Sequence, residues 1–224
     1  MRYRHEVKHV ISALDKAVLM ARLSAVAKKD AHAGSSGQYR VRSLYFDNLY
    51  DRALMDKLSG TSYREKFRLR YYNEDNACIR LEKKVKEGGM GYKLSAPVTK
   101  EEAQKIVDGD TMWMATSPHA LVRELYVRMK TEGLRPRTIV DYTRTPFVYA
   151  PGNVRVTLDS EIRTGMRCMD FLNPNCLTVP IKNSPSILEV KWDQYLPDVV
   201  RNAIQLGCRH SSAFSKYAAS RMYD

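Results

Sequence analysis

Residues Arg64 to Lys93 read REKFRLRYYNEDNACIRLEKKVKEGGMGYK, and they contain the most regular charge pattern of the chain. Two segments within it, 66–71 and 79–86, alternate between charged and apolar side chains. A period of two is typical of a β-strand with two unlike faces. Turn-forming residues 73–76 separate the segments, so the stretch predicts an antiparallel hairpin. One face of this hairpin would carry about six cations and one carboxylate.

Such a face calls for an explanation, because like charges opposite each other on neighbouring strands destabilise a sheet. One interpretation is a solvated outer face, which is the usual location of charged side chains. The other interpretation is a surface that binds anions. The hairpin alone does not distinguish the two, so the remainder of the chain must.

The composition describes a basic globular chain of 224 residues with a formal charge of +12 at pH 7. Hydrophobic residues make up 44% of it and no linker or repeat divides it, so we expect a single domain over residues 1–224. The charge favours polyanionic partners: nucleic acid, an anionic membrane surface or a polyphosphorylated small molecule. No apolar run approaches the roughly 20 residues of a membrane span, and the N-terminus shows no signal-peptide pattern. We therefore expect no membrane span in this chain and a cytoplasmic location.

The alternation of the hairpin recurs along the chain, nearly always with arginine, lysine or glutamate on the polar side. Amphipathic helices, including one that Ser12 opens and one that Thr99 opens, are available to cover the apolar sides. These features together predict an α+β fold: a closed eight-stranded antiparallel β-barrel with a charged lumen and helices packed outside. The further alternating segments are 4–11, 39–46, 92–95, 138–147, 153–162 and 187–192.

Charge balance inside such a lumen is the next constraint, because an unpaired buried charge is costly. The carboxylates on the polar faces are too few to neutralise the bases. A bound phosphate chain together with a divalent metal, which prefers oxygen ligands, would account for the difference. The carboxylates in question are Glu6, Glu82, Asp159, Glu161 and Glu189.

The cysteines do not suggest a metal centre. They form no CxxC pair and have no histidine at ligand spacing, so free buried thiols are predicted in place of a zinc site. They are Cys78, Cys168, Cys176 and Cys208.

A series of short motifs, in chain order, resembles the VTC domain, the polyphosphate-polymerase domain of the CYTH-like triphosphate tunnel metalloenzyme superfamily. Each motif alone is weak, but eight in sequence over essentially the whole chain are specific. They are Arg4-x-Glu6-x-Lys8, Tyr45-Phe46-Asp47, Arg68-Leu69-Arg70, Leu81-Glu82-x-Lys84, Tyr142-x-Arg144, Val154-Arg155-Val156-Thr157-Leu158-Asp159, Leu188-Glu189-Val190-Lys191 and Ser215-Lys216-Tyr217. One departure is Arg4, which stands where the superfamily's ExExK signature has its first glutamate.

The resemblance implies a site that holds a triphosphate through basic residues and a Mn²⁺ or Mg²⁺ ion through glutamate. The implied catalytic residues are Lys8, Arg68, Arg70, Lys84, Arg144, Arg155 and Lys216, and Lys93 and Lys191 join them as substrate ligands. The implied metal ligands are Glu189 first, then Glu6, Glu82 and Glu161.

Three functions are compatible with these residues. The first is a polyphosphate polymerase that moves the γ-phosphate of ATP to a polyphosphate chain, with no protein nucleophile. The second is an inorganic triphosphatase or nucleotide phosphohydrolase, in which Glu6 or Glu161 would activate water. The third is a non-catalytic module that binds polyphosphate or nucleic acid. Nucleic acid is disfavoured, because the charged strand faces carry few of the aromatic residues on which bases stack.

Overall fold

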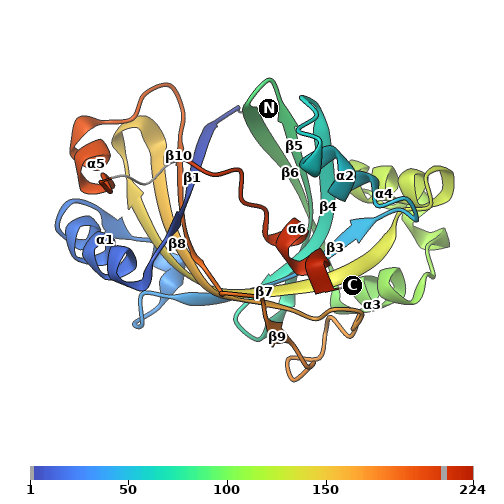
Figure 1. Ribbon diagram of the computed structural model, residues 1–224. Helices are drawn as coiled ribbons and strands as arrows, with labels where there is room; N and C mark the ends of the chain where they lie inside the picture. Colours follow the sequence, from blue (N-terminus) through green and yellow to red (C-terminus); the bar gives the residue numbers. More distant parts are fainter. Residues whose placement is uncertain (1–2, 208–210, 224) are drawn as a thin grey trace.

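An antiparallel sheet, in which eight strands follow one another in a continuous hydrogen-bonded order, forms the body of the protein (Figure 1). The computed structural model describes residues 3–207 and 211–223. The order of the strands is β1-β10-β8-β7-β3-β4-β5-β6, and two short strands, β2 and β9, pair with β7 and β8. The bounds are β1 His5–Ile11, β2 Lys28–Lys29, β3 Tyr39–Asp47, β4 Arg64–Tyr72, β5 Asp75–Glu87, β6 Met90–Val98, β7 Arg135–Tyr149, β8 Val154–Thr164, β9 Val179–Pro180 and β10 Ser186–Trp192.

The sheet curls strongly, so that β8, β10 and β1 form one side, β4, β5 and β6 form the other, and β7 joins them below (Figure 1). Its two edge strands meet at an isolated bridge, where the amides and carbonyls of Arg4 and Gly91 exchange hydrogen bonds of 3.1 and 3.3 Å. Along β1, the amide of Ser212 also donates to the Lys8 carbonyl, at 2.7 Å. The predicted α+β class and the eight antiparallel strands are confirmed. The predicted closed barrel is not confirmed. The described strands form a half-barrel, and its two edge strands pair only at the Arg4–Gly91 bridge.

The opening hairpin is confirmed as β4 and β5, with Arg68 opposite Glu82 and Lys66 opposite Lys84. Its charged face points to the concave side of the sheet, while Leu69 and its apolar neighbours face the helices outside. The alternation therefore predicted the strands, and the helices determine which face is covered.

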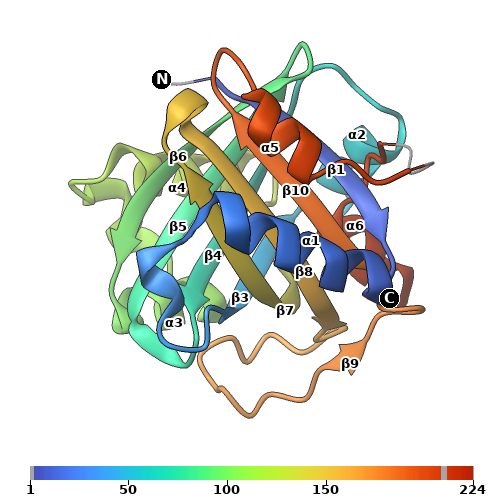
Figure 2. The same cartoon turned by 90° about the vertical axis from the view of Figure 1, so that its left-hand side faces the viewer.

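Helices pack on the convex side in two groups. The first group, α1 and α5, lies across β8 and β10 (Figure 2). The second group, α3 and α4, packs on β5 and β6. The predicted N-terminal caps are confirmed: Ser12 and Thr99 each form a capping box with an acidic residue three positions later. The bounds are α1 Ala13–Val26, α2 Arg52–Leu58, α3 Lys100–Asp108, α4 Ala120–Thr131, α5 Asp198–Ala203 and α6 Lys216–Ser220, with 3₁₀ turns η1 Ala31–Ala33, η2 Met112–Thr116, η3 Pro151–Asn153 and η4 Arg221–Tyr223.

One end of the concave side is filled by apolar side chains. Val41, Val140, Ile162 and Ile187 are all fully buried there, in one cluster with Tyr142. Val140, Ile162 and Ile187 share their strands with charged residues of the concave face, namely Arg144, Arg155 and Lys191. The interior is therefore polar only over part of its length.

Strand β3 is reversed relative to the sequence interpretation, which placed its arginines on the charged inner face. Ser43 and Tyr45 face inward, whereas Arg42 points outward and is buried beneath the segment 165–178. There Arg42 forms a two-pronged ion pair with Asp141, with both contacts at 2.8 Å, and donates to the carbonyl of Asn173. Alternation shows that two faces differ, but a covered ion pair outside the sheet produces the same pattern as a charged lumen.

The three cysteines that the structure describes are free thiols, but not all of them are buried. Cys78 is exposed, while Cys168 and Cys176 lie next to each other with 2.6 Å between their Sγ atoms. Cys208 lies outside the described residues. Among the helices of the described chain, none is long and apolar enough to cross a membrane.

Candidate functional site

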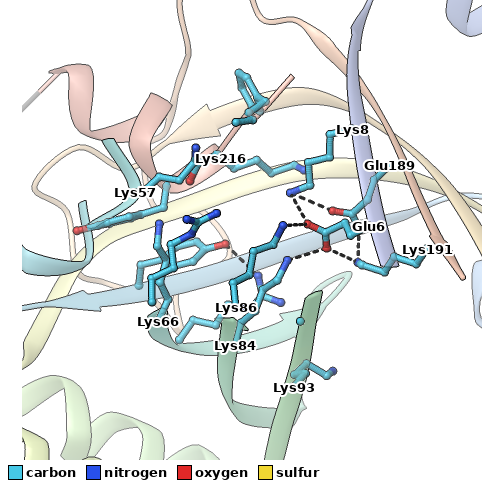
Figure 3. Close-up of a pocket in the computed structure, with 18 of the residues that line it drawn as sticks. Glu6, Lys8, Lys57, Lys66, Lys84, Lys86, Lys93, Glu189, Lys191 and Lys216 are labelled. Carbon is cyan, nitrogen blue, oxygen red and sulfur yellow. Dashed lines mark hydrogen bonds and ion pairs between the residues drawn. The ribbon is translucent and has the colours of Figure 1, made fainter. Parts of the chain in front are cut away.

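A cavity of about 440 Å³ opens on the concave side of the sheet, and all nine basic residues predicted to bind phosphate line it (Figure 3). Over the described chain, its wall contains fourteen lysine and arginine side chains but only two carboxylates, Glu6 and Glu189. The nine predicted ligands are Lys8, Arg68, Arg70, Lys84, Lys93, Arg144, Arg155, Lys191 and Lys216.

Strand parity explains how residues distant in sequence reach one cavity. Inward positions on β1, β4, β5, β6, β7, β8 and β10 each contribute at least one of these charges. Lys216 is the exception, because it comes from α6 at the C-terminal end of the chain. Tyr217, the next residue, fixes this helix by donating to the buried Asp47 carboxylate at 2.5 Å. The motifs around Asp47 and Lys216 therefore meet in space.

The two lining carboxylates hold four lysines, and we call these six residues the Glu6–Glu189 group. Lys8 lies between the carboxylates, with its Nζ 3.5 Å from Glu6 Oε1 and 3.1 Å from Glu189 Oε2. Lys84 and Lys86 approach Glu6 at 2.7 and 3.3 Å. Lys191 forms ion pairs with both glutamates. The group thus carries an excess of positive charge (Figure 3).

The pKa values in this group move in different directions. Burial alone would raise the pKa of Glu6, but Lys84, Lys8 and Lys191 outweigh it and bring that pKa far below its ordinary value. The pKa of Glu189 is also well below its ordinary value, since nearby cations again overcome burial. Burial lowers the pKa of Lys84 to about 7, with help from Lys8 and Lys191. The carboxylates are therefore ionised at neutral pH, and Lys84 is the lysine most ready to exchange a proton.

Beneath the lining arginines lie two more buried carboxylates, which orient them. Asp159, 0% exposed, accepts from Arg144 Nε and Nη2 at 2.6 and 2.8 Å, and from Lys216 Nζ at 2.6 Å. Glu82, 1% exposed, accepts from Arg68 Nε at 2.8 Å and from Lys93 Nζ at 2.5 Å. Such two-pronged contacts fix the plane of a guanidinium group. The N–H groups that these contacts leave unused are therefore held in a fixed plane at the cavity wall.

Tyrosine hydroxyls form a further set of partners that sequence reasoning missed. Arg68 donates to the Tyr45 hydroxyl at 2.9 Å, and Arg155 donates to the Tyr39 hydroxyl at the same distance. Burial would raise the pKa of Tyr45, yet the surrounding cations, Arg68 foremost, lower it to about 8. Tyr45 belongs to a predicted motif and Tyr39 begins the same strand, but with β3 interpreted as arginine-inward neither was assigned to the lumen.

Three lining cations belong to no ion pair, and we call them the basic mouth: Lys57, Arg64 and Lys66. In the described chain, no carboxylate lies within ion-pair distance of any of them. Lys66 Nζ lies 4.9 Å from the ring centroid of Tyr217, and Arg64 donates to the Thr61 carbonyl at 2.7 Å. Burial, reinforced by its two cationic neighbours, lowers the pKa of Lys66 to about 8. Strand alternation could not predict Lys57, because this residue lies on the short helix α2 and not on an alternating strand.

The predicted metal ligands separate into three environments. Glu6 and Glu189 line the cavity together. Glu82 lies beneath the cavity and forms ion pairs with Arg68, Arg70 and Lys93. Glu161 lies on the outer face, exposed, where its carboxylate accepts from Thr143 at 2.6 Å. A bulge in β8 opposite the β7 segment between Asp141 and Thr143 causes this, since Glu161 has a positive φ of 54° and the register shifts there. The strand's alternation therefore ends one residue before Glu161.

Oxygen donors suited to a divalent ion are thus reduced to Glu6 and Glu189. Among the described residues, no three histidine, cysteine or acidic side chains converge as a ligand set. Mg²⁺ is commonly held by one or two carboxylates, with substrate phosphates and water completing its shell. This pair fits a divalent ion on the condition that phosphate supplies the other ligands.

Comparison with known proteins agrees with this architecture. The family model of the VTC domain matches residues 3–223. No curated protein matches the chain. A candidate adenylate cyclase from Bacillus halodurans is 16% identical in its solved structure, over 85% of this chain and 82% of that protein, with a TM-score of 0.50. A Pyrococcus horikoshii OT3 protein is 11% identical over 97% of this chain and 94% of that protein, with a TM-score of 0.48. The first of these likenesses supports the fold alone.

Proposed function

Because this chain belongs to the VTC domain family, we propose that it transfers the γ-phosphate of ATP to the end of a polyphosphate chain in the basic cavity. The observation that carries this proposal is the composition of the cavity wall, in which fourteen cations of the described chain surround two carboxylates. Phosphoryl transfer requires little covalent chemistry from a protein, since positioning and charge stabilisation supply most of the catalysis. A wall with this excess of cations suits a chain of phosphates.

Arginines and lysines would have distinct roles in this reaction. Arg144 and Arg68 are held in fixed planes by Asp159 and Glu82, so their free N–H groups suit two-pronged contacts with phosphate oxygens. The lysines of the Glu6–Glu189 group act as point charges around the reacting phosphate. Lys216, from α6, adds a cation from the C-terminal side.

The reaction needs no nucleophile from the protein. A terminal phosphate oxygen of the acceptor chain forms the new bond to the γ-phosphorus. The bond from that phosphorus to the β,γ-bridging oxygen breaks, and its electron pair leaves with ADP. A Mg²⁺ or Mn²⁺ ion at Glu189 and Glu6, when bound, supplies further neutralisation of phosphate charge. We include in the proposal that the curled sheet encloses the substrate as a tunnel, completed along the edges of β1 and β6.

Hydrolysis of a triphosphate in the same cavity has less support. A carboxylate that activates water works best with a pKa raised toward neutrality. The pKa of Glu6 is instead held low by three lysines, and Glu161 lies on the outer face. No observation of the described residues favours water as the acceptor.

Incubation of the purified chain with ATP and Mn²⁺ tests the proposal. We expect long-chain polyphosphate and ADP as products. Rapid release of free phosphate without polyphosphate would favour a triphosphatase, and the absence of both products with retained polyphosphate affinity would indicate a binding module. Either of these results would overturn the polymerase assignment.

A further inference from the structure

The basic mouth differs from every other charged part of the cavity because, in the described chain, no carboxylate forms an ion pair with it. The nine predicted phosphate ligands all contact a carboxylate, directly or through a shared partner, or lie in the Glu6–Glu189 group. Lys57, Arg64 and Lys66 have no such partner in the described chain. Figure 3 places Lys57 and Lys66 on one side of the cavity and the two lining glutamates on the other.

We propose that the basic mouth is a separate anion subsite and that the rest of the cavity holds a triphosphate-length segment, so that the mouth binds the phosphates of the acceptor chain beyond that segment. This subsite rests on the proposed function, since it names where the acceptor lies. Its ligand class is a linear inorganic polyphosphate longer than a triphosphate.

Mutual repulsion among the three cations is the first reason. Placing them together disfavours their charged forms, as the pKa values of both lysines show: burial lowers each, and Arg64 lowers each further. An anion between them would reverse this cost. Arg64 uses one N–H for the Thr61 carbonyl, which leaves its other donors available.

The second reason is the direction in which a long chain can leave the cavity. One end of the concave side is filled by Val41, Val140, Ile162 and Ile187, and burial of phosphate among apolar side chains is strongly unfavourable. On the side of the Glu6–Glu189 group, the two ionised carboxylates offset part of the lysine charge in the absence of a metal. The basic mouth is neither filled by apolar side chains nor offset by an ion-paired carboxylate of the described chain. The reacting phosphate would therefore lie toward the Glu6–Glu189 group, and the remainder of the acceptor would lie toward the basic mouth.

Affinity measurements on two ligands separate this subsite from the rest of the cavity. The variant K57Q/R64Q/K66Q and the wild type are titrated with tripolyphosphate and with medium-chain polyphosphate by calorimetry. The matched control is K100Q/K105Q/K130Q, which removes the same formal charge from exposed positions on α3 and α4. Thermal unfolding of both variants establishes that they are folded.

We expect the mouth variant to bind medium-chain polyphosphate at least about tenfold more weakly, because charge-assisted contacts to phosphate are the strong ones. Its affinity for tripolyphosphate should match that of the control. The slope of log affinity against log salt for the long chain should also become shallower by about two, as expected when three released counterions are lost.

Three outcomes would overturn the subsite. Equal losses for both ligands would mean that the mouth contributes only a general field, and no loss for either would mean that it binds nothing. Loss of long-chain affinity in the control as well would assign the effect to net charge. Failure of the proposed function is distinguishable, because the wild type would then bind neither ligand or would form no polyphosphate while the subsite is still measured by binding.

Discussion

The two sides of the cavity carry like charges in unlike settings. In the Glu6–Glu189 group, four lysines share two carboxylates, and ion pairs fix where each ammonium group lies. In the basic mouth, three cations have no carboxylate partner in the described chain, so no ion pair holds their positions. Pairing lowers the cost of burying charge and orients it before the substrate arrives. A side built from ion pairs suits a reaction that needs fixed geometry, whereas an unpaired side suits a flexible chain.

The largest effect that would test this comparison is removal of Glu189. The substitution Glu189→Gln removes one of the two carboxylates that Lys8 and Lys191 share, and with it one predicted metal ligand. We expect polyphosphate synthesis to fall about 10²- to 10³-fold, the usual loss when one preorganised electrostatic group is removed from an active site. The measurement is the initial rate of polyphosphate formation from ATP.

Glu161 provides the matched substitution, because the resemblance implied the same role for it. Glu161→Gln alters an exposed carboxylate on the outer face, so the rate should stay close to that of the wild type. Equal losses in the two variants would show that the cavity, as placed here, is not the site of reaction.

The next effect concerns Asp159, one of the two buried carboxylates beneath the lining arginines. It holds Arg144 in a fixed orientation. Asp159→Asn breaks the two-pronged contact with Arg144 and leaves Lys216 without its ion pair. Removing one partner of a buried ion pair typically costs about 3–5 kcal/mol of folding free energy. Urea unfolding of the variant measures this loss. A change below about 1 kcal/mol, which is typical of surface pairs, would mean that the arginine is not held as described.

The sequence predicted the ion-paired residues of the cavity better than it predicted the basic mouth. Arg68 and Lys84 lie on strands with clear alternation, and the charge imbalance indicated that their face was inside. Lys57 lies on a helix, where a period of two carries no information. The alternation of β3 was correct, but its inner face was misassigned, because Arg42 pairs with Asp141 under a long segment outside the sheet.

Glu161 was misplaced for a different reason. A single bulge shifts every later side chain of a strand to the opposite face. The local sequence does not indicate the bulge in β8, since its positive φ belongs to a glutamate, a residue type that rarely adopts this conformation. Closure of the barrel also depends on how far the sheet curls, and that is set by strand tilt and register, which a local pattern does not encode.

The smallest effect is the number of protons taken up when polyphosphate binds. One lysine on each side of the cavity contributes to this uptake. Lys84, in the Glu6–Glu189 group, has a pKa lowered to about 7, and Lys66, in the basic mouth, has a pKa lowered to about 8. Burial is the main cause for both. The charged groups that act on Lys84 are Glu6, Lys8, Lys191 and Glu189, and those that act on Lys66 are Tyr45, Asp47, Lys57 and Arg64.

The sign of the effect follows from which form binds phosphate. A lysine whose pKa is lowered in the free protein is partly neutral near pH 7.5, and an anion favours its charged form, so binding takes up protons and affinity falls as pH rises above about 7. At pH 7.5, Lys84 should take up roughly three quarters of a proton and Lys66 roughly one quarter. Calorimetry in buffers of different ionisation enthalpy measures this uptake.

Two substitutions assign the uptake to its side of the cavity. Arginine stays charged throughout this pH range, so Lys84→Arg should abolish most of the uptake with tripolyphosphate. Lys66→Arg should leave that value unchanged and remove only the additional uptake that medium-chain polyphosphate produces. If Lys66→Arg instead reduced the uptake with tripolyphosphate, the short ligand would already reach the basic mouth, and the two sides would act as one continuous site.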